Sequence, residues 1–223
     1  VTKNNQLTAF LTVREGGLRV AYLWGESTFE PKFVRRAIDQ SPDMQLDSVH
    51  VPHGHRDDWP LDWTDILQAQ DYDVYILHSV HAAALGEDYL AELAEAVEGG
   101  VGLIMVGGTF SFGPGGYYKS PLAAVLPVKM DRLERQDFDS PVSGDLHLSN
   151  RKMVPVDRQF ILHLAPGREN EAVWNSLPAL DYINRFRGIK PRAMVLARSD
   201  EDEPVLVAGE YGSGRVLAFA GDS

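Results

Sequence analysis

Cysteine is absent from this chain of 223 residues. A protein without thiols forms no disulfide, thiolate zinc site or iron–sulfur cluster, and it has no cysteine nucleophile. The compartment stays open, because a cysteine-free protein is indifferent to the redox state around it. A chain of this length can bury a substantial apolar core, so it needs no such crosslink to fold.

Positive charge is scarce as well. The chain has 21 Lys and Arg residues against 32 Asp and Glu residues, a formal net charge of −11. An acidic surface repels phosphate backbones, so we expect no general nucleic-acid binding.

Long apolar runs are also missing: Gly100 to Gly108 is far shorter than the roughly 20 residues that span a bilayer. The polar start, Val1 to Gln6, lacks the apolar region of a signal peptide, and we expect no membrane contact by this segment.

Short apolar runs and amphipathic segments alternate through the first half of the chain. The runs typical of buried strands are Leu18–Trp24, Leu46–Val51, Asp73–Leu77 and Val101–Val106. Helices are predicted from Pro31 to Gln40 and from Glu87 to Glu98, the second ending at a glycine pair. This alternation predicts one α/β domain with a mainly parallel sheet.

The second half is less regular. Pro121 to Leu126 is predicted as a short helix, and residues from Val128 to Leu164 as extended pieces and loops. Pro204–Glu210 and Arg215–Ala220 are apolar runs joined by a short glycine-containing turn, which predicts a hairpin. We expect this hairpin to extend the sheet.

Polar residues follow several predicted strands. Ligands of open parallel sheets bind at the carboxyl ends of the strands. In a flavodoxin-like order the second and third strands flank the first, which would place Glu26 between their ends. His53, His55 and His81 could then surround one crevice and bind a transition metal or exchange protons. No H-E-x-x-H or similar motif fixes them, so plain loop histidines are the alternative; our prediction is no metal and no cofactor.

The stretch from Gly107 to Ser120 is the most distinctive segment, and its many glycines allow the backbone to approach a ligand closely. It ends in Lys-Ser like a phosphate loop, but Tyr118 stands where such a loop needs glycine. The alternative is an ordered loop whose aromatic residues, Phe110, Phe112 and Tyr117, anchor it to the core.

A serine hydrolase is a further hypothesis. The G-x-S-x-G motif of such enzymes does not occur in this sequence. The catalytic candidates that remain are Ser79 with His81 nearby after the third strand, and Thr109 and Ser111 after the fourth. A hydroxyl nucleophile needs a base within hydrogen-bond reach, which a sequence does not reveal.

Eight segments fall in an order known from one family. They are LRVAYLWGE (Leu18–Glu26), FEPKFVRRA (Phe29–Ala37), DYDVYIL (Asp71–Leu77), LAELAEAVEGGVGLIMVGG (Leu90–Gly108), SFGPGGY (Ser111–Tyr117), PLAAVLPV (Pro121–Val128), WNSLPAL (Trp174–Leu180) and GSGRVLAFAGDS (Gly212–Ser223). The chain thereby resembles the class I glutamine amidotransferase-like superfamily, specifically the GATase1-like domains of bacterial membrane proteins with von Willebrand factor A domains. SFGPGGY is the most specific of these segments.

The resemblance implies a Cys–His–Glu triad, with the thiolate on a sharp turn after a central strand. The equivalent turn here reads Gly107-Gly108-Thr109, and the late segment near Asp222 has no His-Pro-Glu. The resemblance therefore carries over the fold and none of the three catalytic residues. ThuA-like proteins, a neighbouring branch, place a histidine soon after the equivalent strand, where this chain has Phe110.

The resemblance also implies a β-rich segment before the domain. Leu7–Val13 is similar to the last strand of such a segment, so residues 1–17 are predicted as an N-terminal strand and linker and 18–223 as the domain. We expect an excised or processed domain, in which Leu7–Val13 would be an exposed or swapped edge strand.

These observations predict a three-layer α/β sandwich, flavodoxin-like, with a mainly parallel sheet. The leading hypothesis is an amidotransferase-like domain without amidotransferase activity that binds a protein partner or a small ligand at the strand ends. The alternative is a hydrolase or metal-dependent enzyme that uses Glu26, His53, His55 and His81 or a Ser/Thr nucleophile. The expected ligand-binding residues are Gly25, Glu26, Gly107, Gly108, Thr109, Ser111, Gly113, Gly115, Gly116 and Tyr117. Other domains of a larger chain or a second copy are the expected partners, in the cytoplasm or in the soluble part of a membrane-anchored bacterial protein.

Overall fold

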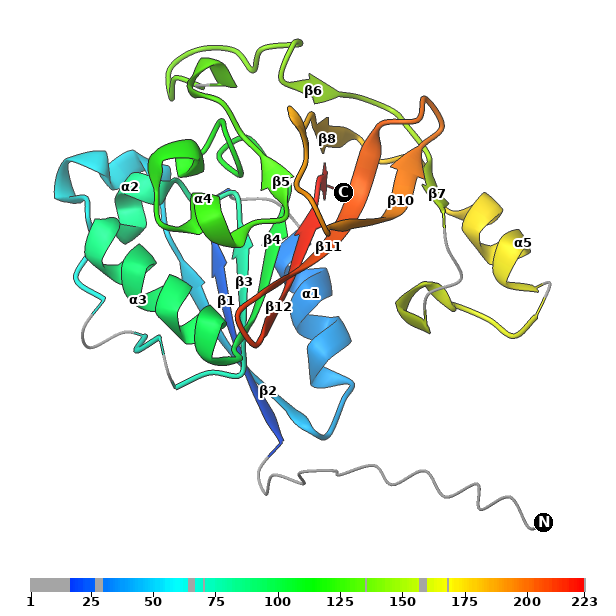
Figure 1. Cartoon of the computed structure of the whole chain (residues 1–223), viewed down its shortest axis with the longest axis horizontal. Coiled ribbons are helices and arrows are strands. Elements are labelled where there is room, and N and C mark those ends of the chain that lie inside the picture. The colour runs from blue at the N-terminus through cyan, green and yellow to red at the C-terminus, as the bar shows by residue number, and fades with distance from the viewer. Residues whose placement is uncertain are drawn as a thin grey trace, which may run out of the picture.

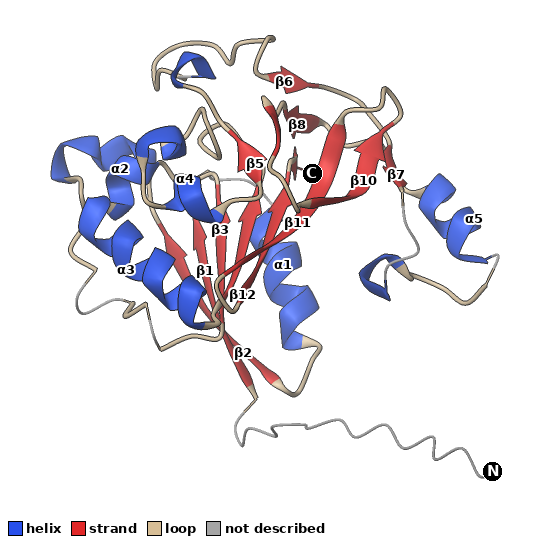
Figure 2. Cartoon of the chain, viewed as in Figure 1, coloured by secondary structure: helices blue, strands red, loops and turns tan. Residues whose placement is uncertain are grey.

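The computed structural model describes residues 17–26, 30–63, 67–69, 71–134, 136–156, 160–167 and 169–222. They form an α/β fold around an eight-stranded mixed sheet with the order β2-β1-β3-β4-β12-β11-β10-β7 (Figures 1 and 2). Its strands are β1 (Leu18–Trp24), β2 (Met44–His50), β3 (Val74–His78), β4 (Gly102–Val106), β7 (Met153–Pro155), β10 (Met194–Ser199), β11 (Pro204–Tyr211) and β12 (Gly214–Phe219). The predicted α/β class is confirmed.

The strands from β2 to β12 in this order are parallel. β1 lies between β2 and β3, as expected, and Trp24 pairs with both His50 and His78. Because these strands end level with one another, the loops that follow them meet at one edge of the sheet.

The predicted hairpin is present, but it does not simply extend the parallel sheet. β11 and β12 pair antiparallel through a two-residue turn in which Gly212 has a φ of 57°. β12 lies parallel beside β4, and β11 begins an antiparallel half that continues through β10 and β7. The C-terminal hairpin thus joins the two halves of the sheet.

Helices pack on both faces of the parallel strands, because successive side chains of a strand point to opposite faces. On one face α1 (Glu30–Asp39) places Val34 and Ile38 against Tyr22 and its neighbours. On the other, α3 (Glu87–Gly99) buries Leu90 and Leu93 in the main core. Both helices were predicted from their apolar spacing.

The remaining elements are short. They are α2 (Ala82–Leu85), α4 (Leu122–Val125), α5 (Glu169–Ser176), the 3-10 helices η1 (His53–Asp58), η2 (Tyr117–Lys119), η3 (Arg132–Glu134) and η4 (Phe160–Leu162), and two small sheets made of β5 (Val128–Lys129) with β9 (Gly188–Ile189) and of β6 (His147–Leu148), β8 (Tyr182–Asn184) and β13 (Gly221–Asp222). α4 confirms the predicted short helix; α5 and β10 were not predicted.

The predicted strand Leu7–Val13 lies outside the described residues. In the part of the chain that the structure describes, no helix has the length and apolarity that a membrane crossing requires.

Candidate functional site at the strand ends

Three chain segments approach one another at Gly25, directly after β1. The Gly25 amide donates to the His78 carbonyl over 3.0 Å. A methyl group built on Gly25 would lie 2.1 Å from the Ser79 carbonyl oxygen and 2.5 Å from His53 Nε2, so no other residue fits. The ends of β1, β2 and β3 are therefore packed backbone to backbone, as the strand order predicts.

Ser79 is the centre of a hydrogen-bond network at the end of β3. It adopts a left-handed conformation with a φ of 49°, which is uncommon for a serine. Its amide donates to Ser111 Oγ over 3.0 Å, its Oγ accepts from the Phe110 amide over 3.1 Å, and its carbonyl lies 2.9 Å from His53 Nε2. The Ser111 hydroxyl in turn donates to the Val106 carbonyl over 2.6 Å. Both serines are fully buried, so these two candidate nucleophiles hold the turn together.

The turn after β4 accepts only glycine at position 108. Gly108 has a φ of 142°, and a methyl group on it would lie 2.7 Å from Ser79 Cβ and 3.4 Å from Glu26 Oε2. Thr109, the next residue, is half-buried. The place where a side chain of residue 108 would stand is thus occupied by Ser79, with the Glu26 carboxylate beside it.

Asn184 in β8 clamps this turn and was missed by sequence reasoning. Its buried amide accepts from the Gly108 amide over 2.9 Å and donates to the Gly108 carbonyl over 3.2 Å. The two residues are 76 positions apart in an irregular region, and no motif marks Asn184.

Five rings gather above the strand ends: His53, Trp59, His81, Phe110 and Phe138. The ring centroids of Phe110 and Phe138 are 4.3 Å apart, and those of His53 and Phe110 are 4.5 Å apart. Two of the three predicted histidines are therefore brought together, but they meet through aromatic packing. Burial lowers the pKa of His53, against the raising effect of the nearby Glu26 carboxylate.

The third histidine, His55, lies apart from this cluster. It is exposed on η1, and its Nδ1 is 3.9 Å from an oxygen of Asp58. Within the described ranges, no group of three or more His, Asp or Glu side chains is arranged to hold a metal ion. The expected crevice lined by all three histidines is thus not formed.

A cavity of about 270 Å³ lies beside the glycine-rich loop. Its lining residues are His81, Gly113, Pro114, Gly116, Tyr118, Lys119, Gln136, Asp137 and Phe138. His81 Nδ1 accepts the Ala83 amide over 3.1 Å, so in the neutral ring the proton is on Nε2. A methyl group built on Gly116, another lining residue, would lie 3.4 Å from that Nε2. His81 therefore presents an N–H donor at the cavity wall.

Other residues of the loop are used for its own packing. Tyr117 is fully buried, donates to the Val80 carbonyl over 2.7 Å, and has its pKa raised by burial. A methyl group on Gly113 would collide with the buried Glu134 carboxylate, and one on Gly115 with the Phe110 carbonyl. The expected anchoring of the loop by its aromatic residues is present, and Gly113 and Gly116 are the expected binding residues that reach the cavity.

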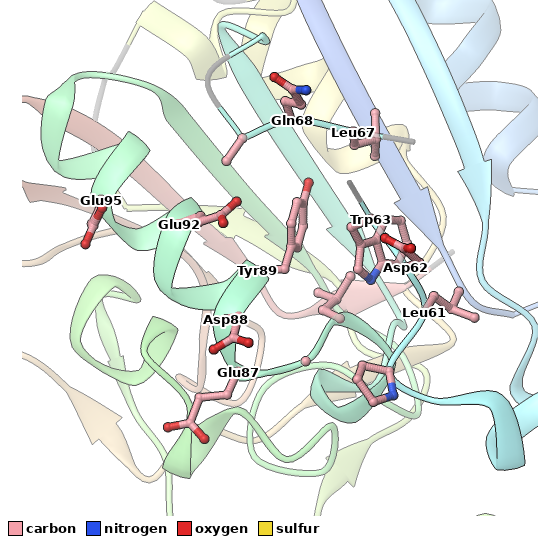
Figure 3. Close-up of a pocket in the computed structure, with 14 residues that line it drawn as sticks. Leu61, Asp62, Trp63, Leu67, Gln68, Glu87, Asp88, Tyr89, Glu92 and Glu95 are labelled. Carbon is pink, nitrogen blue, oxygen red and sulfur yellow. The ribbon is translucent and has the colours of Figure 1, made fainter. Parts of the chain in front are cut away.

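A larger cavity of about 540 Å³ lies elsewhere, between α3 and residues 60–69 (Figure 3). The charged residues of its lining are all acidic: Asp62, Glu87, Asp88, Glu92 and Glu95. Trp63 and Tyr89 line it as a stacked pair, with ring centroids 5.3 Å apart. It shares no residue with the strand-end cavity.

Residues 66–223 match the model of a family described as "Putative glutamine amidotransferase" (GATase1_like). The chain belongs to this family. Two cytoplasmic proteins of Salmonella typhimurium are similar in structure, one from strain LT2 with 21% identity and the other with 17%; each comparison has a TM-score of 0.65 and covers 92% of this chain and 88% of the other. A ThuA-like protein from Parabacteroides merdae, 14% identical with a TM-score of 0.53, covers 92% of this chain and 79% of its own. No curated protein sequence matches. At these identities the solved structures support the fold alone.

Proposed function

We propose that this domain binds a small ligand with an anionic group in the strand-end cavity, and that it has no amidotransferase activity. The observation that carries the proposal is the way the family's catalytic turn is built here. Residue 108 is a glycine that tolerates no side chain, and the hydroxyls of Ser79 and Ser111 bind backbone groups. A nucleophile needs a hydroxyl or thiol that a substrate can reach, and both serines are fully buried.

The charge of the ligand is argued from the cavity wall. On the side formed by the body of the domain, the side chains with polar hydrogens are His81, Tyr118 and the exposed Lys119. All three are donors, and an ammonium group binds carboxylate or phosphate oxygens through charge-assisted hydrogen bonds. The one carboxylate of the lining, Asp137, comes from the exposed segment on the opposite side.

Binding is tested with acetate, benzoate and inorganic phosphate as probes, followed by NMR shifts and calorimetry. We expect His81→Asn and Lys119→Gln each to weaken binding of at least one anion about 10-fold, the loss of one charge-assisted bond. Asparagine at position 81 can still cap α2, so folding is retained. Lys129→Gln, an exposed lysine outside the cavity, is the matched control. The proposal is contradicted if the affinity for anions is unchanged in both variants, or if the domain binds small amines instead.

The absence of catalysis is tested separately by glutamine hydrolysis and by a panel of ester and amide substrates. We expect no turnover. Turnover that is lost on Thr109→Ala or Ser111→Ala would overturn this part of the proposal. It would then favour the alternative, a hydrolase, for which the proximity of Glu26 to His53 is the supporting observation.

The setting of the domain is also a proposal. We propose a flavodoxin-like, three-layer domain of a larger bacterial chain that contains von Willebrand factor A domains, with those domains or a second copy as partners. The order of the parallel strands supports the flavodoxin-like part of this proposal, and the von Willebrand factor A context rests on the resemblance of the sequence segments alone. The two Salmonella neighbours are cytoplasmic, and we propose the same side of the membrane for this domain. The gene sequence around the codons for Val1 and Ser223 tests the setting.

A further inference from the structure

One exposed segment covers the strand-end cavity. The chain between β5 and β6 arches over the carboxyl ends of the strands (Figure 1), and residues 136–143 of it are here named the flap. Gln136 gives the flap its shape: its buried Nε2 donates to the carbonyls of Asp137, Ser140 and Pro141, and its Oε1 accepts the Ser143 amide. A single side chain therefore keeps the flap compact.

The flap is attached to the body of the domain mainly at its tip. The ring of Phe138 lies 4.3 Å from that of Phe110, 5.0 Å from His81 and 5.5 Å from Trp59, measured between centroids. The Arg56 guanidinium lies 4.7 Å above the Phe138 ring and 3.3 Å from the carboxylate of Asp139. An aromatic contact and an exposed ion pair thus tie the tip of the flap to the body of the domain.

Phe138 is only half-buried, and the Arg56–Asp139 ion pair is exposed, so each of these contacts is weaker than a contact in the buried core. The flap also forms one wall of the cavity through Gln136, Asp137 and Phe138, while His81, Gly113 and Lys119 belong to the opposite wall. Lifting the flap would open the cavity along its length.

We infer that the flap is a lid that opens to admit the ligand, with Phe138 as the residue that closes it. This inference rests on the proposed function, because a lid has a role only if the cavity binds a ligand. In the closed form Phe138 packs in the five-ring cluster, and the Arg56–Asp139 ion pair adds a second contact between the lid and the body of the domain.

Because the chain has no cysteine of its own, a thiol reagent reacts only with a cysteine that is introduced by substitution. Tyr118→Cys places a thiol in the cavity lining, and Ser213→Cys places one on the exposed hairpin turn as a control. We expect N-ethylmaleimide to label position 118 about 10-fold or more slowly than position 213. Adding Phe138→Ala should remove most of that difference, and Asp139→Asn should change it less.

Phe138→Leu, which keeps an apolar side chain, should give an intermediate rate, and thermal unfolding of every variant shows that the fold is retained. The lid proposal is overturned if positions 118 and 213 are labelled at equal rates while Phe138 is intact. It is also overturned if Phe138→Ala leaves the rate at position 118 unchanged. Labelling needs no ligand, so the lid can fail while anion binding persists. If the labelling rate at position 118 depends on the residue at position 138 but no anion binds, the proposed function is refuted. The role of the lid in ligand entry is then refuted with it.

Discussion

Gly108 shows at the scale of one residue how tightly the turn after β4 is packed. Its φ of 142° is strained for any residue with a Cβ, and a methyl group would meet Ser79 Cβ at 2.7 Å. We predict that Gly108→Ala destabilises the fold by about 2–4 kcal/mol, as strain and overpacking add. Urea unfolding measures this.

The matched control for that substitution is Gly99→Ala at the end of α3, where nothing lies within 4 Å of the added methyl group. It should be neutral or stabilising by up to about 1 kcal/mol, because alanine is the better helix former. Equal effects at positions 99 and 108 would contradict this account of the turn.

His53 makes the stability of the site depend on pH. Burial lowers its pKa below the usual 6.5, with further lowering by His50 and Arg56 and opposition from Glu26. Below pH 6.5 the unfolded chain therefore binds a proton that the folded chain resists. The contribution of His53 is full above that pH and is lost as the pH falls from 6.5 towards the lowered pKa.

The measurement is the free energy of unfolding at pH 7.5 and 5.5 for the parent chain and for His53→Gln, whose amide can still donate to the Ser79 carbonyl. Other groups titrate in both proteins and cancel in the difference. We expect the parent to lose more stability than the variant on acidification. Parallel pH profiles would show that His53 does not resist protonation.

At the scale of elements, position in the sheet decides what a side chain contributes. Val154 lies half exposed on the edge strand β7, whereas Val207 is fully buried in β11. We predict that Val154→Thr changes stability by less than about 0.5 kcal/mol, while Val207→Thr costs about 1–3 kcal/mol for a buried hydroxyl. Thermal unfolding of the two variants tests the ranking, and a reversal would argue against this strand order.

The elements that the sequence predicts well are those with a strong local pattern. The apolar runs of β1, β3 and β4 and the amphipathic face of α3 each fix their element within a few residues. α5 has no fully buried residue, so its apolar pattern is too weak to predict a helix. The pairing partner of β12 could not be predicted from the residues near it, because that partner, β4, lies more than a hundred positions earlier in the chain.

The candidate site was predictable in outline for the same reason. Parallel strands bring their ends together, so Glu26, His53, Ser79 and His81 could be placed at one edge from the strand order alone. Asn184 and Phe138 could not, because Asn184 ends a strand of three residues and Phe138 lies in a turn, and both reach the site through tertiary packing. The geometry of His81 depends on its bond to the Ala83 amide, which the sequence does not show.

At the scale of the whole molecule, β12 couples the two halves of the sheet. Trp63 belongs to the core that includes α3, and Trp174 packs on the cluster around β10 and β11. Because the sheet runs unbroken between them, we predict a single cooperative unfolding transition. Variants that keep only Trp63 or only Trp174, the other tryptophans being replaced by phenylalanine, should give the same urea midpoint. Separate midpoints would indicate two independent folding units.

The place of β12 in the sheet has a consequence for how the protein is made. Residues 214–219 form an interior strand, yet they leave the ribosome after every other strand of the eight. Until they emerge, β4 presents an unpaired edge to the cell, and an open apolar edge invites pairing with other chains. The nascent chain is therefore expected to depend on protection by chaperones, and to aggregate when translation stalls shortly before codon 214.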